Sequence, residues 1–519
     1  MLEFKSKMQR TRAIIENRFW KQTDPNSEKE IRRFQKKPQQ RFGIRRSLLI
    51  LAAIAFSIPM TSMARTADDS VLSGIKIPTL NFTPPPVDSR ELTPYATLYR
   101  LHNDTLPVVR LRIIIEGGED LESIKEAGNL DAMAALLETS GAGKLSAEDM
   151  ANQLALLGAS IGTSVSDQSW EISLSAMRDD FPRALDLLVL LLSEPDFDES
   201  SLSTVKNQMI TSIRSRTDDP STIGFLKLSA VMFPDTRRGY AIQEKDVARI
   251  SLESARSTYD NRLKRARYHI ALDGDFQGLN VEKKLVDLLR KLPVPEKPLS
   301  VLPDNGFKAP EDKNPYRGKI VHVTGDYPQS LLIVASPTVA HNSKDFYTLQ
   351  LGNHILGGGS FTSRLMQEIR VKRGLAYYAY SFNRSKASEG YLAAVSATRS
   401  QRAGETLGLM LQMIEGMKSN VDSGDVAEAR TAILNSLVFL YDNPSEILGD
   451  HIRFRIDQMP ENYLNQFPER IKAVDSTDIK NAFQKYMDRD DLFIVVVGPE
   501  SLAKDLRNIA PVITMEAAP

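Results

Sequence analysis

Alternation of apolar and polar residues predicts strands in this chain, and apolar residues at helical spacing predict helices between them. Residues 109–113 alternate between apolar and charged side chains, as a strand with one buried face requires. Ser146 and Asp149 form the sequence pattern of a helix N-terminus. The first half is predicted to have strands at 96–100, 108–116, 160–164 and 169–176, and helices at 127–137, 147–157, 183–193 and 201–216. The second half is predicted to have strands at 330–335, 375–383 and 390–397, and helices at 345–356, 362–372, 404–418 and 423–440, with a glycine turn at 357–359.

The two halves resemble each other in sequence. Residues 169–176 match residues 390–397 at an offset of 221, and Asp-Asp-Pro-Ser at 218–221 matches Asp-Asn-Pro-Ser at 442–445 at an offset of 224. A nearly constant offset of this size predicts duplicated domains, because solenoid repeats are only about 20–50 residues long. Two unrelated domains that share an order of elements are the alternative. We predict two homologous α+β domains, each with a mostly antiparallel sheet backed by helices.

Composition shifts divide the chain of 519 residues into five parts. We predict a basic tail and signal segment at 1–64, a Pro-rich linker at 65–90, a first domain at 91–295, a second Pro-rich linker at 296–318 and a second domain at 319–519.

The N-terminal part has the pattern of an export signal. Arg45 and Arg46 precede an apolar run at 48–58, and the small residues that follow predict cleavage after Ala64, or after Ala67. We therefore predict a periplasmic or otherwise exported protein. The alternative is an uncleaved membrane anchor at 47–64 with a basic cytoplasmic tail. The unusual length of residues 1–44 is also consistent with a start codon placed too early.

Composition excludes several classes of site. The chain has no cysteine, so it has no disulfide, Cys–zinc site or thiol nucleophile. Lys plus Arg and Asp plus Glu both number 66, so the overall charge does not indicate a nucleic-acid partner. None of the six histidines has another four residues away, so a zinc site built on one helix is not predicted.

Arg370 and Tyr377 are the residues best suited to binding chemistry. Arg370 lies near the predicted end of helix 362–372, Gly374 follows it, and Tyr377 lies in the next predicted strand. A guanidinium donates two parallel hydrogen bonds to a carboxylate or carbonyl, and a phenol adds a further donor. The alternative is an Arg on a solvated helix face and a Tyr packed in the sheet.

The stretch from Gly358 to Tyr377, with Ser363-Arg364-Leu365, Ile369-Arg370 and Arg373-Gly374-Leu375-Ala376-Tyr377, resembles the second-half signature of the pitrilysin/insulinase family of inverted-zincin peptidases. The resemblance covers roughly residues 90–510. It implies two homologous domains that face each other across a cleft, like a clam shell. It also implies that Arg370 and Tyr377 bind the substrate peptide and stabilise its transition state.

The family's zinc motif, H-x-x-E-H, is absent from the matching helix. The two His positions fall on Asp131 and Ala135, and the Glu position falls on Ala134. The distal Glu ligand falls on Thr211 or Ser212. Alanine has no atom that ligates zinc or moves a proton, so we predict no metal and no catalytic residue in this chain.

Several family members are heterodimers in which one subunit has the zinc motif and the other supplies the Arg and Tyr. The resemblance thus implies that this chain is the non-catalytic, substrate-binding subunit of an exported heterodimeric zinc peptidase. Its expected partners are a zinc-bearing subunit with H-x-x-E-H and a peptide substrate, with no nucleic acid. One alternative is a peptide-binding or scaffold protein without a peptidase role, and another is an autonomous hydrolase with an unrecognised site. The chain by itself does not separate a homodimer from a heterodimer.

Overall fold

The computed structural model describes residues 83–84, 86–264, 266–292, 314–441 and 443–517. The predicted tail and signal segment at 1–64 lie outside the described residues, as does most of the predicted linker at 296–318. The first strand begins at Asp88, within the last residues of the predicted linker at 65–90.

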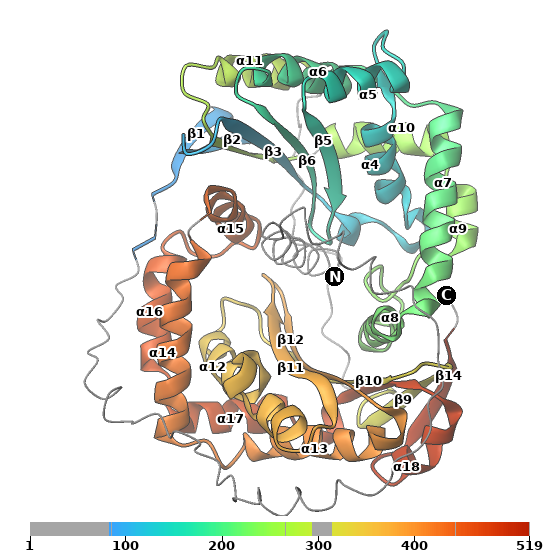
Figure 1. The fold of residues 1–519 in the computed structure, drawn as a ribbon, viewed down its shortest axis with the longest axis vertical. Coiled ribbons are helices and arrows are strands. Elements are labelled where there is room, and N and C mark those ends of the chain that lie inside the picture. The colour runs from blue at the N-terminus through green and yellow to red at the C-terminus, as the bar shows by residue number, and fades with distance from the viewer. Residues whose placement is uncertain (1–82, 85, 265, 293–313, 442, 518–519) are drawn as a thin grey trace, which may run out of the picture. The chain divides into compact units, whose positions relative to one another are not determined.

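The first half forms a six-stranded sheet in the order β1-β2-β8-β3-β6-β5. All neighbouring pairs are antiparallel except β2 with β8, which is parallel. The strands are β1 (Asp88–Thr93), β2 (Ala96–His102), β3 (Val108–Glu116), β5 (Ser160–Val165), β6 (Ser169–Met177) and β8 (Tyr268–Gly274). The helices of this half include α4 (Asn129–Thr139), α5 (Ala147–Leu156), α6 (Phe181–Ser193), α7 (Glu199–Arg214), α9 (Glu244–Arg249), α10 (Leu252–Lys264) and α11 (Val281–Lys291), and several of them cover one face of the sheet (Figure 1).

The second half forms a sheet in the order β11-β12-β10-β13-β9-β14. Here β9 is parallel to both of its neighbours, and the other pairs are antiparallel. The strands are β9 (Lys319–Thr324), β10 (Ser330–Thr338), β11 (Ala376–Ser385), β12 (Gly390–Thr398), β13 (Phe493–Gly498) and β14 (Val512–Glu516). The helices include α12 (Asp345–Asn353), α13 (Ala403–Gly416), α14 (Ser423–Leu440), α16 (Tyr463–Ala473), α17 (Ser476–Tyr486) and α18 (Ala503–Arg507).

The two sheets have the same topology, which confirms the predicted α+β class. The order β2-β8-β3-β6-β5 in the first half corresponds, strand by strand, to β9-β13-β10-β12-β11 in the second. In the first half β8 lies between β2 and β3, and in the second half β13 lies at the corresponding place between β9 and β10. The extra edge strands differ, since β1 is antiparallel to its neighbour and β14 is parallel to its neighbour.

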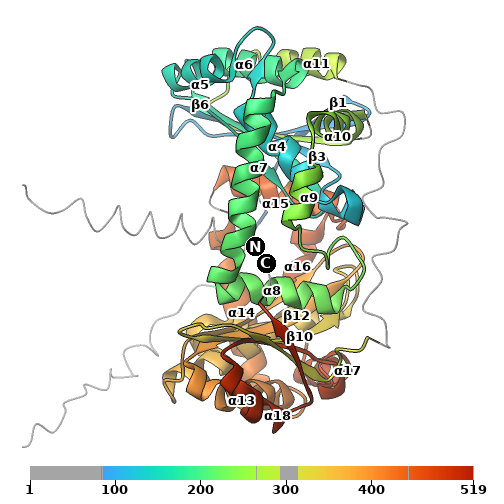
Figure 2. The same ribbon diagram turned by 90° about the vertical axis from the view of Figure 1, so that its right-hand side faces the viewer.

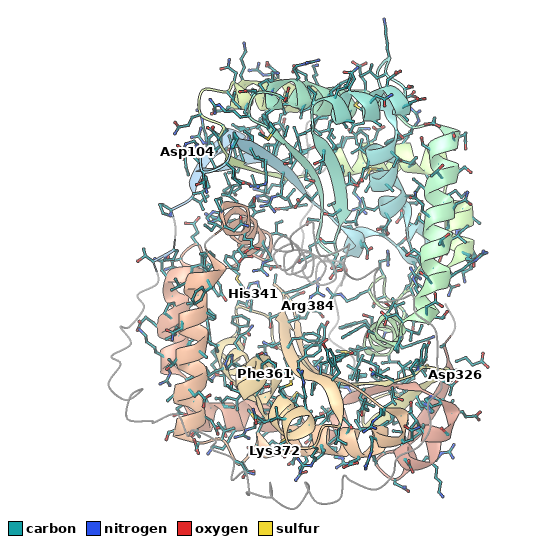
Figure 3. All side chains as sticks on the ribbon, in the orientation of Figure 1. Asp104, Asp326, His341, Phe361, Lys372 and Arg384 are labelled. Atoms are coloured by element: carbon teal, nitrogen blue, oxygen red, sulfur yellow. The ribbon has the colours of Figure 1, made fainter. Side chains whose placement is uncertain are left out.

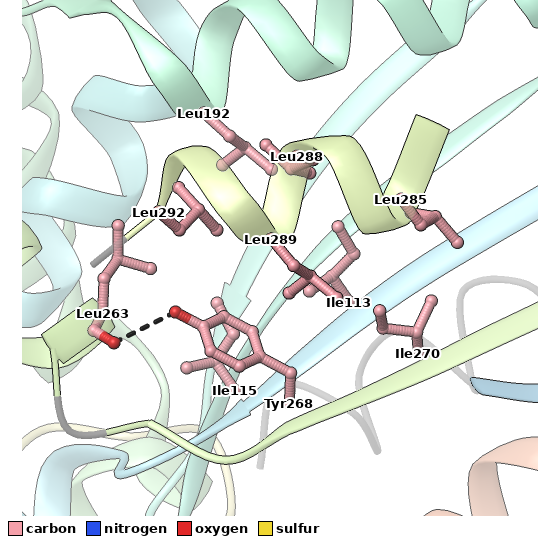
Figure 4. Close-up of a pocket in the computed structure, with 10 residues that line it drawn as sticks. All are labelled: Ile113, Ile115, Leu192, Leu263, Tyr268, Ile270, Leu285, Leu288, Leu289 and Leu292. Carbon is pink, nitrogen blue, oxygen red and sulfur yellow. Dashed lines mark hydrogen bonds between the residues drawn. The ribbon is translucent and has the colours of Figure 1, made fainter. Parts of the chain in front are cut away.

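Local patterning explains the core of the first half. The alternating residues Trp170, Ile172, Leu174 and Ala176 of β6 are all buried. Leucines of α11 pack on the same face of the sheet and enclose a small apolar cavity (Figure 4). The hydroxyl of Tyr268 in its wall donates to the carbonyl oxygen of Leu263 at 3.1 Å, so the cavity is a packing feature with no free polar group for a ligand.

Each half contributes one helix to the other half. Helix α8 (Pro220–Met232) follows the first half's α7 (Figure 2), yet its apolar residues pack against strands β10 and β13 of the second sheet. Helix α15 (Pro444–Ile456) belongs to the second half, yet it packs against β2 and β8 of the first sheet. These helices begin at the two matching motifs, where Asp219 and Asn443 accept hydrogen bonds from the first-turn N–H groups. The duplicated sequence therefore specifies a reciprocal exchange of helices.

The exchange brings backbone and side chains of the two halves into close contact. Arg112 of β3 donates to the carbonyl oxygen of Ser445 at 2.6 Å, and the Ser445 hydroxyl donates to buried Asp273 at 2.8 Å. On the other sheet, Gly224 of α8 lies so close to β10 that an added Cβ would stand 2.4 Å from Leu331 Cδ2.

A cluster of charges also joins the halves. Asp167, in the β5–β6 hairpin, pairs with Arg384 at 3.2 Å and with Lys386, both from the β11–β12 hairpin. Figure 3 labels Arg384. Arg238 pairs with Asp167 at 3.7 Å and with Glu389. Burial alone would raise the pKa of Asp167, but the three cations hold it well below its usual range. The corresponding hairpins of the two halves therefore meet through paired charges.

We predict that Gly224→Ala lowers the free energy of unfolding, because the new methyl group forces Leu331 to move within a packed core. Such overpacking costs about 1–3 kcal/mol. The matched control is Gly408→Ala in α13, where an added Cβ meets nothing within 4 Å. That change should stabilise the protein by up to about 1 kcal/mol, because alanine favours helix. Urea unfolding of both variants measures the difference, and equal effects would contradict the close contact.

Candidate functional site

The positions that match the zinc motif lie on α4. Gly128, at a φ of 91°, precedes the helix, and Leu130, Met133 and Leu137 bury one side of it in the core. Ala134 is buried, and its carbonyl oxygen accepts a hydrogen bond from the Thr163 hydroxyl of β5 at 2.9 Å. Asp131 and Ala135 are half-buried. The predicted helix is confirmed, and its three motif positions carry one carboxylate and two methyl groups.

The distal ligand position lies on α7, which packs against α4. Thr211 and Ser212 are both exposed, and the Thr211 hydroxyl donates to the carbonyl oxygen of Asn207 within the same helix at 2.8 Å. In the part of the chain that the structure describes, no three His, Asp or Glu side chains come close enough to hold a metal ion. Helices α4 and α7 are thus in contact, but the side chains at the matched positions include only one metal-ligating carboxylate, Asp131.

Charged side chains that patterning did not identify surround Asp131. Glu119, in the short helical turn η1 (Glu119–Leu121), lies beside it, and Arg237 contacts Glu119 at 3.7 Å and Glu122 at 3.1 Å. Burial and the neighbouring Asp131 raise the pKa of Glu119 to about 7, although the charge of Arg237 opposes this. Burial also raises the pKa of Asp131, against the charges of Arg237 and Arg216. The first motif position thus carries the carboxyl group of Asp131. The carboxyl group of Glu119 and the buried guanidinium of Arg237 lie beside it.

The region around Arg370 differs from the prediction of two regular helices joined by a glycine turn. Helix α12 ends at Asn353 and continues as a π-helical turn, η4 (His354–Gly358), and Arg370 lies in a second one, η6 (Met366–Val371). The short turn η5 (Ser360–Thr362) joins them. One reason is the close approach of Gly357 to β11, where an added Cβ would stand 2.3 Å from the Ser381 nitrogen. Single π-helical turns are rare and frequently occur at functional sites.

The structure brings Arg370 and Tyr377 together. The guanidinium carbon of Arg370 lies 5.3 Å from the centre of the Tyr377 ring and 5.2 Å from that of the Phe361 ring. Tyr377 is the extra residue of a β-bulge between Ala376 and Tyr378, and 75% of it is exposed. The alternative of a Tyr packed in the sheet is therefore wrong. Phe361, which the sequence analysis did not select, completes the group, and its signal was an aromatic residue directly after Gly-Gly-Ser.

Comparison with known proteins shows what this chain is similar to in sequence and in fold. A family model described as "Peptidase M16 inactive domain" matches residues 249–433, which include Phe361, Arg370 and Tyr377. A Helicobacter pylori protein named "Non-peptidase homolog YmxG" is 23% identical over 403 residues, which cover 76% of this chain and 90% of that protein. The crystal structure of a peptidase M16 inactive domain from Pseudomonas fluorescens superimposes with a TM-score of 0.69 at 24% identity, covering 80% of this chain and 98% of that one. Residues 249–433 therefore match the M16 inactive-domain family, and the chain is similar in sequence and fold to inactive M16 homologues.

The match to the M16 family model confirms the resemblance to the pitrilysin/insulinase peptidases. A further relative, the "Probable mitochondrial-processing peptidase subunit beta, mitochondrial" of Arabidopsis thaliana, is 22% identical over 332 residues, covering 61% of this chain and 60% of that protein. The zinc ion of active M16 members does not fit the residues found here. Asp131 is one carboxylate where several ligands are needed, and Arg237 places a positive charge beside it.

We predict that the chain is less stable at pH 7.5 than at pH 5. The folded-state pKa of Glu119, about 7, lies above its unfolded value of about 4.3, so the folded state binds more protons between these values. The free energy of unfolding should therefore fall as pH rises through this window. We expect a fall of about 1–2 kcal/mol, because solvent screens part of the interaction at a side chain that is 32% exposed. Urea unfolding at both pH values measures it. Glu119→Gln should flatten the dependence, whereas the control Glu148→Gln, at an exposed position on α5, should preserve it.

We also predict that restoring the three motif residues does not restore tight zinc binding. The variant Asp131→His, Ala134→Glu, Ala135→His still lacks a ligand on α7, and it retains Arg237 beside the site. Isothermal titration with zinc should therefore show no tight site, and addition of Thr211→Glu or Ser212→Glu is the matched comparison. A tight site in the triple variant alone would show that the distal position is not needed.

Proposed function

We propose that this chain is the non-catalytic, substrate-binding subunit of an exported heterodimeric zinc peptidase. One observation carries the proposal. Arg370 and Tyr377 remain together at an accessible surface, whereas the positions for zinc and its general base hold Asp131, Ala134 and Ala135. The chain therefore has groups that bind a peptide and lacks those that cleave it.

The chemistry of the pair supports a role in binding. A guanidinium donates in-plane hydrogen bonds to a carbonyl or carboxylate, and the phenol of Tyr377 adds a donor to the same region. Among the described residues, the only acceptor recorded for Arg370 is the sulfur of Met366, at 4.0 Å. Thioether sulfur is a weak acceptor, so the strong donors of Arg370 remain available to a ligand.

The names of the relatives support a role as one subunit among several. The Helicobacter pylori relative is named a non-peptidase homologue, and the Arabidopsis relative is named a subunit of a processing peptidase. We propose by analogy that this chain associates with a second M16 protein that has H-x-x-E-H and holds the zinc ion. The reaction would then take place at the partner's metal, and Arg370 and Tyr377 would bind the peptide that is cleaved there.

Export is the further part of the proposal. It is supported by the signal pattern around residues 45–64, which lies outside the described residues. None of the helices in the described part of the chain combines the length and apolar character needed to cross a bilayer. Cleavage after Ala64 would release a periplasmic chain, and an uncleaved segment at 47–64 would anchor it to the inner membrane.

The deciding experiment is a pull-down of the chain from residue 65 onward out of its native host. Mass spectrometry would identify the partner, and a peptidase assay with and without a zinc chelator would measure activity. Recovery of an H-x-x-E-H protein, with activity only in the mixture, is the expected result. A chain that is recovered alone or self-associated, and inactive with zinc, would replace the proposal with a peptide-binding or scaffold role.

For the assembled enzyme we predict that Arg370→Ala and Tyr377→Phe each lower kcat/KM by roughly 10²-fold, as loss of one transition-state donor does. The control is Arg402→Ala, which removes an exposed arginine that pairs with neighbouring Glu405 at 2.8 Å. Thermal unfolding of all three should change little, because Tyr377 and Arg402 are exposed and half-buried Arg370 has only a weak acceptor, the Met366 sulfur, among the described residues. Full activity in both test variants would rule out their role in peptide turnover.

A further inference from the structure

The turn that carries Phe361 is held in an unusual backbone shape. The preceding Ser360 has a φ of 54°, a left-handed conformation that non-glycine residues rarely adopt. Its carbonyl oxygen accepts a hydrogen bond from the Ser363 hydroxyl at 2.7 Å, and the amide of Gln367 donates to the Phe361 carbonyl oxygen at 2.5 Å. Backbone strain of this kind persists where surrounding contacts enforce it, and it is concentrated at functional sites.

These contacts hold a large apolar side chain in water. Phe361 is 57% exposed, and Figure 3 shows its position in the second half. Its ring lies under the guanidinium of Arg370, which the ring of Tyr377 also contacts. Aromatic rings attract a cation to their faces, so the two rings restrict the orientation of the guanidinium. The N–H groups at its edge are left to meet a ligand in their own plane.

The local charge favours an anion over a neutral carbonyl. Glu368 is the one acidic residue between positions 366 and 373, and it is paired with both Lys372 and Arg373. Three cations, Arg370 among them, against one carboxylate give the segment 366–373 a formal excess of two positive charges. A carboxylate binds more strongly because of this positive charge, and also because the guanidinium can donate two parallel hydrogen bonds to its two oxygens. A neutral backbone carbonyl is bound much less strongly by the positive charge and by the paired donors.

We propose that Phe361 is a positioning residue that makes Arg370 a receptor for a carboxylate of a bound peptide. This inference rests on the proposed function, in which the same surface binds peptide, and it specifies the class of ligand. The carboxylate comes from an acidic side chain or from the C-terminus of the peptide, since both present the same planar group. Tyr377 forms the other wall of the receptor.

The test is a fluorescence anisotropy titration of the chain from residue 65 onward with three labelled peptides of one sequence. The first has a central Glu and an amidated C-terminus, the second has Gln and a free C-terminus, and the third has Gln and an amidated C-terminus. We expect one of the first two to bind about tenfold more tightly than the third, because a charge-assisted hydrogen bond is worth about that factor. The preferred peptide identifies the source of the carboxylate.

Variants test the role of the ring. Phe361→Leu and Phe361→Ala should reduce the preference for carboxylate several-fold, whereas Phe361→Tyr should retain it. Arg370→Lys should abolish most of it, since lysine keeps the charge but loses the planar fork. The control is Phe439→Ala in α14, which removes another exposed phenylalanine (72%) and should leave binding unchanged. Thermal unfolding of each variant shows whether the fold is intact.

Three outcomes would overturn the inference. Equal binding of all three peptides would remove the carboxylate preference and leave peptide binding in place. A preference that survives in Phe361→Leu would remove the role of the aromatic ring. Absence of binding by any peptide would also overturn the inference, and the activity of the assembled Arg370→Ala enzyme would then decide the proposed function separately.

Discussion

The reciprocal packing of α8 and α15 holds the two halves of the chain together. Each sheet is covered on one face by helices of its own half and receives on the other face a helix from the opposite half. Burial of apolar area is the main favourable term in folding, so neither half completes its core alone. The charge cluster around Asp167 fixes how the two halves are oriented, because the paired charges favour one alignment of the β5–β6 and β11–β12 hairpins. The exchange therefore ties the α4 region to the second half, which carries Arg370.

Arginine has opposite roles at the two candidate positions, and its surroundings explain the difference. Arg237 is buried, and it is paired with Glu119 and Glu122 beside the position that would bind zinc in an active relative. A buried charge must be paired, so the guanidinium of Arg237 has a structural role in the folded chain. Arg370 lies at the surface against two aromatic rings that accept no in-plane hydrogen bond. Its donors remain available, and the residue is suited to recognition.

The sequence correctly predicted those features that depend on residues close together in the chain. The predicted strands at 108–116 and 169–176 and the capping box of Ser146 and Asp149 are confirmed, because side-chain alternation and first-turn hydrogen bonds depend on near neighbours. It missed β8 and β13, two short strands whose residues are all buried, so neither strand has an exposed face. It also missed Glu119 and Arg237, which are far apart in sequence and meet only in the folded chain.

Pattern and spacing along the chain were enough to predict the α+β class and the duplication. The resemblance to a known family then located the altered zinc positions at Asp131, Ala134 and Ala135 and singled out Arg370 and Tyr377. Only the tertiary structure decided which sheet each exchanged helix covers, which charges meet around Asp131, and that Phe361 joins Arg370. The reason is physical. Residue type determines what a side chain can do chemically, whereas contacts across the chain depend on how apolar surfaces pack and on strained turns that local propensity does not favour.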